Sequence, residues 1–398
     1  MTMPEQKKAV VPRLRFPEFR DAGPWEVKRL GDIGPVCMCK RVLKHQTSDK
    51  GDIPFYKIGT FGSKPDAYIS KELYESYKSI YPFPNKGDVL ISASGTIGRT
   101  VVYDGRPAYF QDSNIVWIAN KEAIVLNAFL AYCYETVRWP TDDNTIPRLY
   151  NDNLRKMKIV VPSRQEQQKI ADCLSSLDEV IELEAKKLEA LQAHKKGLMQ
   201  QLFPREGETT PRLRFPEFRN AGPWEVMRLE DYIEQKAGDS KLIKGKLHSA
   251  PRDGRFPGFS ASGQDVWLDT FEHAGPAIIV SAVGARCGRC FLADGKWSAI
   301  ANTHILFPQK SDIDIRFLFE VVTQDGFWII SGSGQPFVKV RDSLRQEVLL
   351  PSLPEQQKIA DCLSSLDELI ELQAKQLEAL QTHKKGLMQQ LFPQEIDL

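Results

Sequence analysis

The chain has 398 residues, more than one ordinary hydrophobic core supports and enough for two cores with a spacer. Its 53 Lys and Arg residues balance 52 Asp and Glu residues, so the net charge of +1 provides no global attraction to nucleic acid or membrane. The contents of 42% hydrophobic and 26% charged residues exclude bulk disorder. There is no signal-peptide-like N-terminus or membrane-length apolar run, and the 7 cysteines suit reduced thiols. We expect a cytoplasmic, soluble, multidomain protein.

The first feature in chain order is a leader that occurs twice. Residues 12–30 read PRLRFPEFRDAGPWEVKRL, and residues 211–229 read PRLRFPEFRNAGPWEVMRL. The two copies differ at two of 19 positions. A repeat this close indicates a chain built from two similar units of about 190 residues, too few and too large for a stacked solenoid.

Each leader precedes an insert that is rich in predicted strands. Residues 87–118 and 275–307 each show an apolar run, a tight glycine turn, a second apolar run, an Asp-Gly turn and a third run. The Asp-Gly turns are Asp104-Gly105 and Asp294-Gly295, and the glycine turn of the second insert is one residue longer. The two inserts share this pattern but little identity. A copied framework therefore holds two inserts that have diverged in the side chains they present.

A long helix is predicted after each insert. Residues 162–204 recur as 351–393 with 37 of 43 positions identical, and an S-x-x-E pattern at each start predicts a capping box. Pro204 and Pro393 end the helices. Apolar residues alternate in steps of four and three, which is a heptad seam that suits one partner helix, and the partners could be each other. The predicted helix-pairing residues are Ile170, Leu174, Leu177, Ile181, Leu188, Leu191, Ile359, Leu363, Leu366, Ile370, Leu377 and Leu380, with Leu198, Leu202, Leu387 and Leu391 extending the seam.

Two seam positions in each helix are polar. Glu184 would lie against Gln373, and Lys195 against Lys384. Buried polar groups of this kind can fix register and orientation in a coiled coil. The alternative is that the seam opens there and these side chains are solvated.

These features predict an α+β fold with a pseudo-two-fold internal repeat. Two globular α/β domains are expected to be separated by an antiparallel coiled coil of two long helices. The expected ranges are 1–161 for the first domain, 162–204 for the first helix, 205–350 for the second domain and 351–398 for the second helix.

Catalytic signatures are absent from the sequence. We find no phosphate loop, H-E-x-x-H pair, G-x-S-x-G elbow or methyltransferase-like [DNS]-P-P-[FYW] stretch. Cys287 and Cys290 have zinc-ligand spacing and His304 could be a third ligand, but no second C-x-x-C exists, so we favour no metal. His194 and His383 occupy equivalent helix positions and are expected to be exposed.

The glycine turns carry arginine and hydroxyl side chains that suit contacts with DNA bases and phosphates. Ordinary surface loops are the alternative for any single residue. The inserts hold 17 basic and 14 acidic residues (31–161) and 14 basic and 15 acidic residues (230–350), which argues against tight autonomous DNA binding. The candidate DNA-contacting residues are Lys57, Thr60, Ser94, Thr96, Arg99, Arg148, Arg252, Arg255, Arg286, Arg289 and Lys339.

The layout resembles the DNA-specificity subunit of a Type I restriction-modification system over essentially the whole chain. The resemblance is carried by PSRQEQQKIA at 162–171, PSLPEQQKIA at 351–360, the helices that follow, and the G-x-W-E-x-x-x-L leaders at 23–30 and 222–229. A G-[TS]-I-G-like turn at 95–98 adds to it. Arg164-Gln165 departs from the usual Leu/Pro before Glu166, which affects a local cap only.

The resemblance implies a non-catalytic chain with two target recognition domains, each reading one half of a bipartite asymmetric DNA site. The helices would set the spacer, with about 57 Å of helix bounding it at about 17 base pairs, and would dock two methyltransferase subunits. Those subunits would bind S-adenosylmethionine and flip the target adenine, and two motor-nuclease subunits would complete the enzyme. A protein-binding scaffold and an autonomous DNA-binding repressor are the alternatives that we retain.

Overall fold

The computed structural model describes residues 10–139, 148–242, 244–332 and 334–393. The chain forms two compact units, one of Met1–Ala185 with Gln376–Leu398 and one of Lys186–Lys375. The boundaries fall inside two 39-residue helices, α5 (Arg164–Leu202) and α8 (Leu353–Leu391). Each unit therefore contains one half of each long helix.

Unit 1 is built on a four-stranded antiparallel sheet of order β2-β8-β5-β6. Its strands are β2 (Val36–Cys37), β5 (Val89–Ser92), β6 (Thr100–Val102) and β8 (Ile115–Ile118). A second sheet has the order β4-β3-β7, from β3 (Ile53–Tyr56), β4 (Tyr68–Ile69) and β7 (Tyr109–Phe110), with β3 and β7 parallel. The leader strand β1 (Glu26–Arg29) pairs with β9 (Lys158–Val161). The short helices are α1 (Leu30–Ile33), α2 (Lys71–Ile80), α3 (Asn127–Thr136) and α4 (Asn151–Lys156).

Unit 2 repeats this plan with different sequence. Its antiparallel sheet has the order β11-β18-β15-β16, from β11 (Ile233–Ala237), β15 (Ala277–Ser281), β16 (Cys290–Ala293) and β18 (Thr303–Pro308). The second sheet has the order β13-β12-β17-β14, from β12 (Phe256–Ser260), β13 (Gly263–Leu268), β14 (His273–Ala274) and β17 (Lys296–Ala299), with β12 and β17 parallel. Leader strand β10 (Glu225–Arg228) pairs with β21 (Glu347–Leu350), and β19 (Ile330–Ser331) pairs with β20 (Phe337–Val338). The short helices are α6 (Ile315–Val322) and α7 (Val340–Leu344).

The central strands are apolar at nearly every position because both faces of their sheet are covered. On β5, Val89 and Ile91 belong to the core shared with the helices, whereas Leu90 packs toward the second sheet. On β15, Ile278 and Ile279 divide in the same way between two cores. Successive side chains of a strand point to opposite faces, so an uninterrupted apolar run is what a doubly covered sheet requires. The strand-rich pattern predicted for both inserts is confirmed, although each Asp-Gly turn joins two sheets and makes no hairpin.

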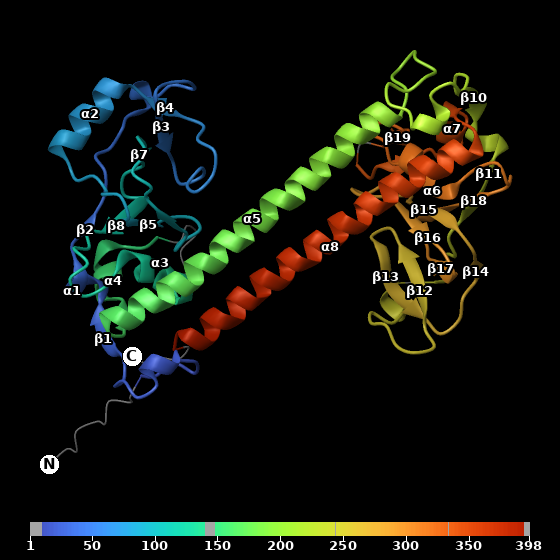
Figure 1. Cartoon of the computed structure of the whole chain (residues 1–398). Helices are drawn as coiled ribbons and strands as arrows, with labels where there is room; N and C mark the ends of the chain where they lie inside the picture. The colour runs from blue at the N-terminus through green and yellow to red at the C-terminus, as the bar shows by residue number, and fades with distance from the viewer. Residues whose placement is uncertain (1–9, 140–147, 243, 333, 394–398) are drawn as a thin grey trace. The chain divides into compact units, whose positions relative to one another are not determined.

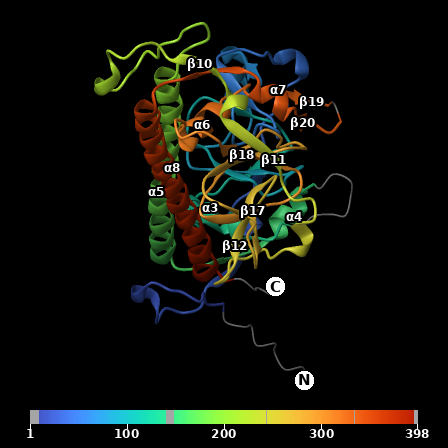
Figure 2. The same ribbon diagram turned by 90° about the vertical axis from the view of Figure 1, so that its right-hand side faces the viewer.

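The core of each unit is completed by the end of a helix from the other repeat. Phe392, at the end of α8, is 2% exposed in the unit 1 core, with its ring centroid 5.4 Å from that of Phe129 and 6.2 Å from that of Trp25. Phe203, at the end of α5, lies 5.4 Å from Phe317 and 5.9 Å from Trp224 in unit 2. In each unit the two helix segments lie side by side and run antiparallel (Figures 1 and 2).

All twenty seam positions of the two helices are buried or half-buried. The polar positions are not simply solvated. In unit 2, Lys195 Nζ lies 2.7 Å from both carboxylate oxygens of Asp367 on α8 and 3.0 Å from Glu320 Oε1 on α6. In unit 1, Lys384 Nζ lies 2.7 Å from Asp178 Oδ1 on α5. Each seam lysine is thus paired with an aspartate of the adjacent helix, and the predicted pairing of Lys195 with Lys384 is wrong.

A buried ion pair fastens each leader to the start of a long helix. Arg15 donates from Nε and Nη2 to the two carboxylate oxygens of Glu166, both at 2.7 Å, and the two side chains are 7% and 1% exposed. Arg214 and Glu355 repeat this bidentate pair at 2.7 and 2.8 Å. Ser163 Oγ accepts from the Glu166 amide at 3.3 Å, as a capping box requires, but the glutamate carboxylate binds the leader arginine. Half of the capping-box prediction for the first helix is therefore correct.

We expect Phe392→Ala to destabilise unit 1 by about 3–5 kcal/mol, because it removes a buried aromatic ring and leaves a cavity. Hydrogen exchange should show lost protection in β5 and β8 and little change in β15 and β18. Phe203→Ala should give the reverse pattern. The exposed Leu183→Ala is the control, with an expected change within about 0.5 kcal/mol. Equal loss of protection in both units for either variant would contradict the assignment.

We expect Lys195→Met to destabilise unit 2 by about 1–3 kcal/mol near neutral pH, because Asp367 and the buried Glu320 lose their cation. Burial raises the pKa of Glu320, so its charged form opposes folding and the penalty grows as pH rises through that pKa. The loss should therefore be smaller at about pH 5 than at about pH 8, measured by urea unfolding. Lys196→Met, an exposed neighbour, is the control. A loss that is the same at both pH values would argue against this account.

Candidate nucleic-acid interface

The glycine turn of unit 1 is a closed and internally bonded hairpin between β5 and β6. The Ser92 amide donates to the Arg99 carbonyl at 2.8 Å, and the Gly98 amide donates to the Ser92 carbonyl at 3.0 Å. The buried Ser92 hydroxyl donates to the Thr96 carbonyl at 2.6 Å. Gly95 and Gly98 have φ of 67° and 84°, the left-handed region that favours glycine. The turn therefore holds its exposed side chains on a fixed backbone.

A tryptophan packs under the turn in each unit. A Cβ added at Gly98 would lie 2.2 Å from the indole of Trp139, so only glycine fits. In unit 2 the turn runs from Ser281 to Arg289, one residue longer as predicted, and Gly288 (φ 85°) lies against Trp328. The closing bond, from the Ser281 amide to the Arg289 carbonyl, is again 2.8 Å. The same support is thus built twice from different sequence.

The candidate residues of unit 1 fall on adjoining loops. Arg99 Nη1 donates to the Phe61 carbonyl at 3.0 Å, which joins the glycine turn to the turn that contains Lys57 and Thr60. Arg148 is exposed and forms an antiparallel bridge with Ser94. Thr96 is exposed on the glycine turn itself. The structure therefore brings the six predicted residues of unit 1 to one region, although Lys57 also pairs with Asp66 at 2.9 Å.

Only three of the five candidates of unit 2 gather in the same way. Arg286 and Arg289 are exposed on the glycine turn. The turn is held to the β20 strand, which precedes the exposed Lys339, because the Gly284 amide donates to the Pro336 carbonyl at 2.8 Å. The other two, Arg252 and Arg255, lie in the loop that precedes β12. Strand β12 lies at the opposite end of unit 2 from β19 (Figures 1 and 2). Arg255 pairs there with Asp269 at 3.4 Å.

The thiols of the second turn have local packing partners. Trp328 Nε1 donates to Cys290 Sγ at 3.2 Å, and burial raises the pKa of that thiol to about 12. His304 Nδ1 lies 3.2 Å from Gln235 Nε2, and burial lowers the pKa of His304. Among the described residues, no group of three or more His, Cys, Asp or Glu side chains could hold a metal ion. The zinc alternative thus has no support from geometry.

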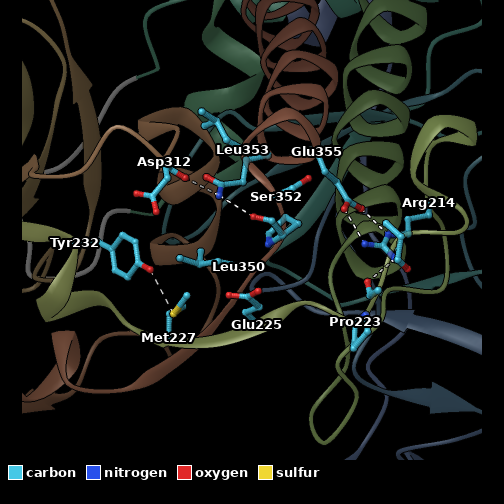
Figure 3. A pocket seen from close by; sticks show the side chains of 14 residues that line it. Arg214, Pro223, Glu225, Met227, Tyr232, Asp312, Leu350, Ser352, Leu353 and Glu355 are labelled. Carbon is cyan, nitrogen blue, oxygen red and sulfur yellow. Dashed lines mark hydrogen bonds and ion pairs between the residues drawn. The ribbon is translucent and has the colours of Figure 1, made fainter.

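A cavity of about 350 Å³ in unit 2 lies at the start of α8 (Figure 3). Arg214 and Glu355 point toward one another at one side of it, and Tyr232 donates to Met227 Sδ at 3.3 Å at the other. Both carboxylate oxygens of Glu355 are bound by the arginine. A second cavity, of about 890 Å³, lies beside Lys195, Glu320 and Asp367. These cavities are lined by the ion pairs that hold the helices.

The sequence did not single out the leader arginines or Phe337. Arg15 and Glu166 are 151 residues apart, and the available signal was their identical recurrence as Arg214 and Glu355. Phe337 is 43% exposed on β20 and bridges to Val283 at the base of the second glycine turn. Its available signal was that it stands 189 residues after Arg148, the same offset that relates the two helices.

No helix in the described ranges has both the length and the apolar character needed to cross a membrane. The fold defines a class of protein. Its members have two similar α/β domains, each with a closed turn that carries exposed side chains, and two long helices that run antiparallel. Residues 23–193 and 222–382 match the family model described as the Type I restriction modification DNA specificity domain. The chain belongs to this family, whose role is recognition of DNA and not catalysis.

Several relatives are similar to the chain. A Haemophilus influenzae protein named as a type I restriction enzyme specificity subunit is 60% identical over 154 residues, which are 38% of this chain and 40% of that protein. The MjaVIII specificity subunit of Methanocaldococcus jannaschii is 24% identical over 96% of this chain and 94% of its own length. The crystal structure of an S subunit from M. genitalium matches 97% of this chain and 100% of its own, with a TM-score of 0.69 and 15% identity. That last likeness confirms the fold.

We expect Gly98→Ala to destabilise unit 1 more than Gly95→Ala. Both substitutions carry a conformational penalty of about 1 kcal/mol at positive φ, but only Gly98→Ala also forces Trp139 to move. Thermal unfolding and tryptophan fluorescence measure the difference. Gly23→Ala, with open space around the new methyl group, is the control. Equal destabilisation by the two turn variants would show that the tryptophan does not support the turn.

Proposed function

We propose that the chain reads a bipartite, asymmetric DNA site, one half with each domain, while the two helices set the gap between the halves. The observation that carries this is the duplicated turn. Ser92 and Arg99 close one turn as Ser281 and Arg289 close the other, yet the exposed side chains around them differ. Two different half-sites require the same turn backbone in both domains with different exposed side chains on it.

The charge distribution supports local contact. Arg99, Arg148, Arg286 and Arg289 have no carboxylate partner within the residues that the structure describes. Guanidinium groups held on a rigid backbone can form bidentate contacts to guanine or bind phosphate. The chain as a whole is nearly neutral, so we expect tight binding only when partner subunits add their own contacts.

The spacer role is supported by the continuity of α5 and α8. Each helix has 39 residues, about 58 Å at 1.5 Å per residue, and each passes from one unit into the other without interruption. A continuous helix changes length only in discrete steps of residues. The gap between the half-sites would therefore be read as length and not as sequence.

Exposed leucines support a docking role for the helices. Leu183 on α5 and Leu372 on α8 are 64% and 63% exposed at equivalent positions, and Val180 and Leu369 are exposed beside them. Large apolar side chains that repeat on the outer face of a helix suit a partner helix. We propose that these faces bind two methyltransferase subunits, which bring S-adenosylmethionine, and that two motor-nuclease subunits join the complex in the cytoplasm.

Genome-wide mapping of adenine methylation, with and without this gene and with its methyltransferase partner present, tests the proposal. We expect one bipartite motif with a fixed gap to lose methylation when the gene is deleted. No change in methylation, with the partner expressed, would contradict the proposal and favour a protein-binding scaffold.

Exchanging residues 231–350 for the same region of another specificity subunit should change one half of the motif and leave the other half and the gap unchanged. The reason is that this segment carries the glycine turn and sheets of unit 2 but contains neither the leader nor any part of the two long helices. Methylation mapping of the chimera measures the outcome. A chimera that alters both half-sites together would show that the domains do not read independently.

A further inference from the structure

The two repeats differ sharply at one structurally equivalent position beside the glycine turn. In unit 1, Arg148 bridges to Ser94, and the Leu149 amide donates to the Ala93 carbonyl at 2.8 Å. In unit 2, Phe337 bridges to Val283, and the Val338 amide donates to the Ala282 carbonyl at 2.9 Å. The backbone is the same in both places, but a polar pair in one unit is an apolar pair in the other.

Phe337 lies on an exposed apolar face. It pairs with Ser331 on β19 and with Val283 on its other side, and cross-strand partners share a face of the sheet. Ile329 precedes Ser331 by two residues, falls on the same face and is 38% exposed, while Phe337 is 43% exposed. An aromatic ring and an isoleucine are thus presented together at the surface.

Cations lie on the segments that adjoin this apolar face, because Lys339 follows Phe337 by two residues and the turn with Arg286 and Arg289 is bonded to Pro336 through Gly284. Arg286, Arg289 and Lys339 are all exposed, and among the described residues none of them has a carboxylate partner. A protein partner for an apolar patch would not require three unneutralised cations around it. The edge of a DNA groove offers both chemistries, because phosphates are anionic and the thymine C5-methyl group is apolar.

We propose that this bridge position is where the two domains discriminate bases, with Phe337 contacting a thymine methyl group in one half-site and Arg148 contacting a guanine in the other. The proposal rests on the proposed function and names the contacts that make the two half-sites different. Ser94 and Val283 flank the same position and match it in polarity. Identical backbone geometry lets one framework present either kind of contact.

The test uses the full chain with its methyltransferase partner and the duplex motif found by methylation mapping. Each thymine of the unit 2 half-site is replaced by deoxyuridine, which lacks only the methyl group, and each guanine of the other half-site by 7-deazaguanine, which lacks N7. Dissociation constants are measured at one fixed salt concentration. We expect the wild type to lose about fourfold in affinity at one deoxyuridine position and about fivefold at one 7-deazaguanine position.

Phe337→Ala should bind weakly and should be indifferent to deoxyuridine, while it still discriminates against 7-deazaguanine. Arg148→Ala should show the opposite pattern, so each variant is the control for the other. Phe337→Leu, which keeps an apolar side chain, should retain part of the sensitivity to deoxyuridine. Unfolding curves that match the wild type would show that the truncations leave the fold intact.

Several outcomes would overturn the inference while leaving the proposed function in place. They are a Phe337→Ala variant with the full deoxyuridine penalty, a wild type indifferent to deoxyuridine, or a half-site without thymine. Loss of methyltransferase assembly in Phe337→Ala would show that the face binds protein. Absence of any bipartite motif would instead refute the proposed function itself.

Discussion

The completion of each domain core by a helix from the other repeat is the constraint on which the rest of the structure depends. Phe392 lies among Trp25 and Phe129 in unit 1, and Phe203 lies among Trp224 and Phe317 in unit 2. A buried aromatic ring of this kind contributes several kcal/mol, so each long helix is anchored at its end by packing and not only by its connection to the preceding strand. Each repeat on its own lacks part of its core. In this chain the second repeat therefore supplies the missing part of the first core, and the first repeat supplies that of the second.

Buried charges add specificity to this packing. The Arg15–Glu166 and Arg214–Glu355 pairs are almost fully buried, and ion pairs of this kind often contribute little net stability compared with apolar residues of the same volume. Their value is geometric, because a guanidinium that binds both carboxylate oxygens fixes the direction of the leader against the helix start. Lys195 acts similarly in the helix seam, since only one register brings it to Asp367 and Glu320 together. Apolar seams tolerate slippage, whereas these polar contacts do not.

Much of the fold follows from local pattern, and much of the site does not. The heptad steps, prolines and internal repeat predict both long helices to within a few residues, and the glycine spacing predicts the longer turn of unit 2, because these signals act over short stretches of chain. The partner of Glu166 is 151 residues away, and a local S-x-x-E pattern assigned it to a cap. The positions of Arg252 and Phe337 also depend on contacts between distant parts of the chain, which local sequence patterns do not predict. Arg252 stands in a basic loop but lies away from the turn, whereas Phe337 has an apolar side chain typical of a core, and only the β19–β20 pairing places it at the surface.

Near-neutrality of the whole chain is compatible with local recognition because the charges are unevenly neutralised. Arg255 is matched by Asp269, Lys57 by Asp66 and Lys195 by Asp367, so these cations contribute little field at a distance. Arg286, Arg289 and Lys339 have no such match among the described residues, and they lie on the glycine turn of unit 2 and directly after β20. Weak overall attraction combined with locally unpaired cations favours discrimination over indiscriminate binding. Since non-specific affinity comes almost entirely from phosphate contacts, a chain whose basic and acidic residues are nearly equal in number gains little of that affinity from its net charge.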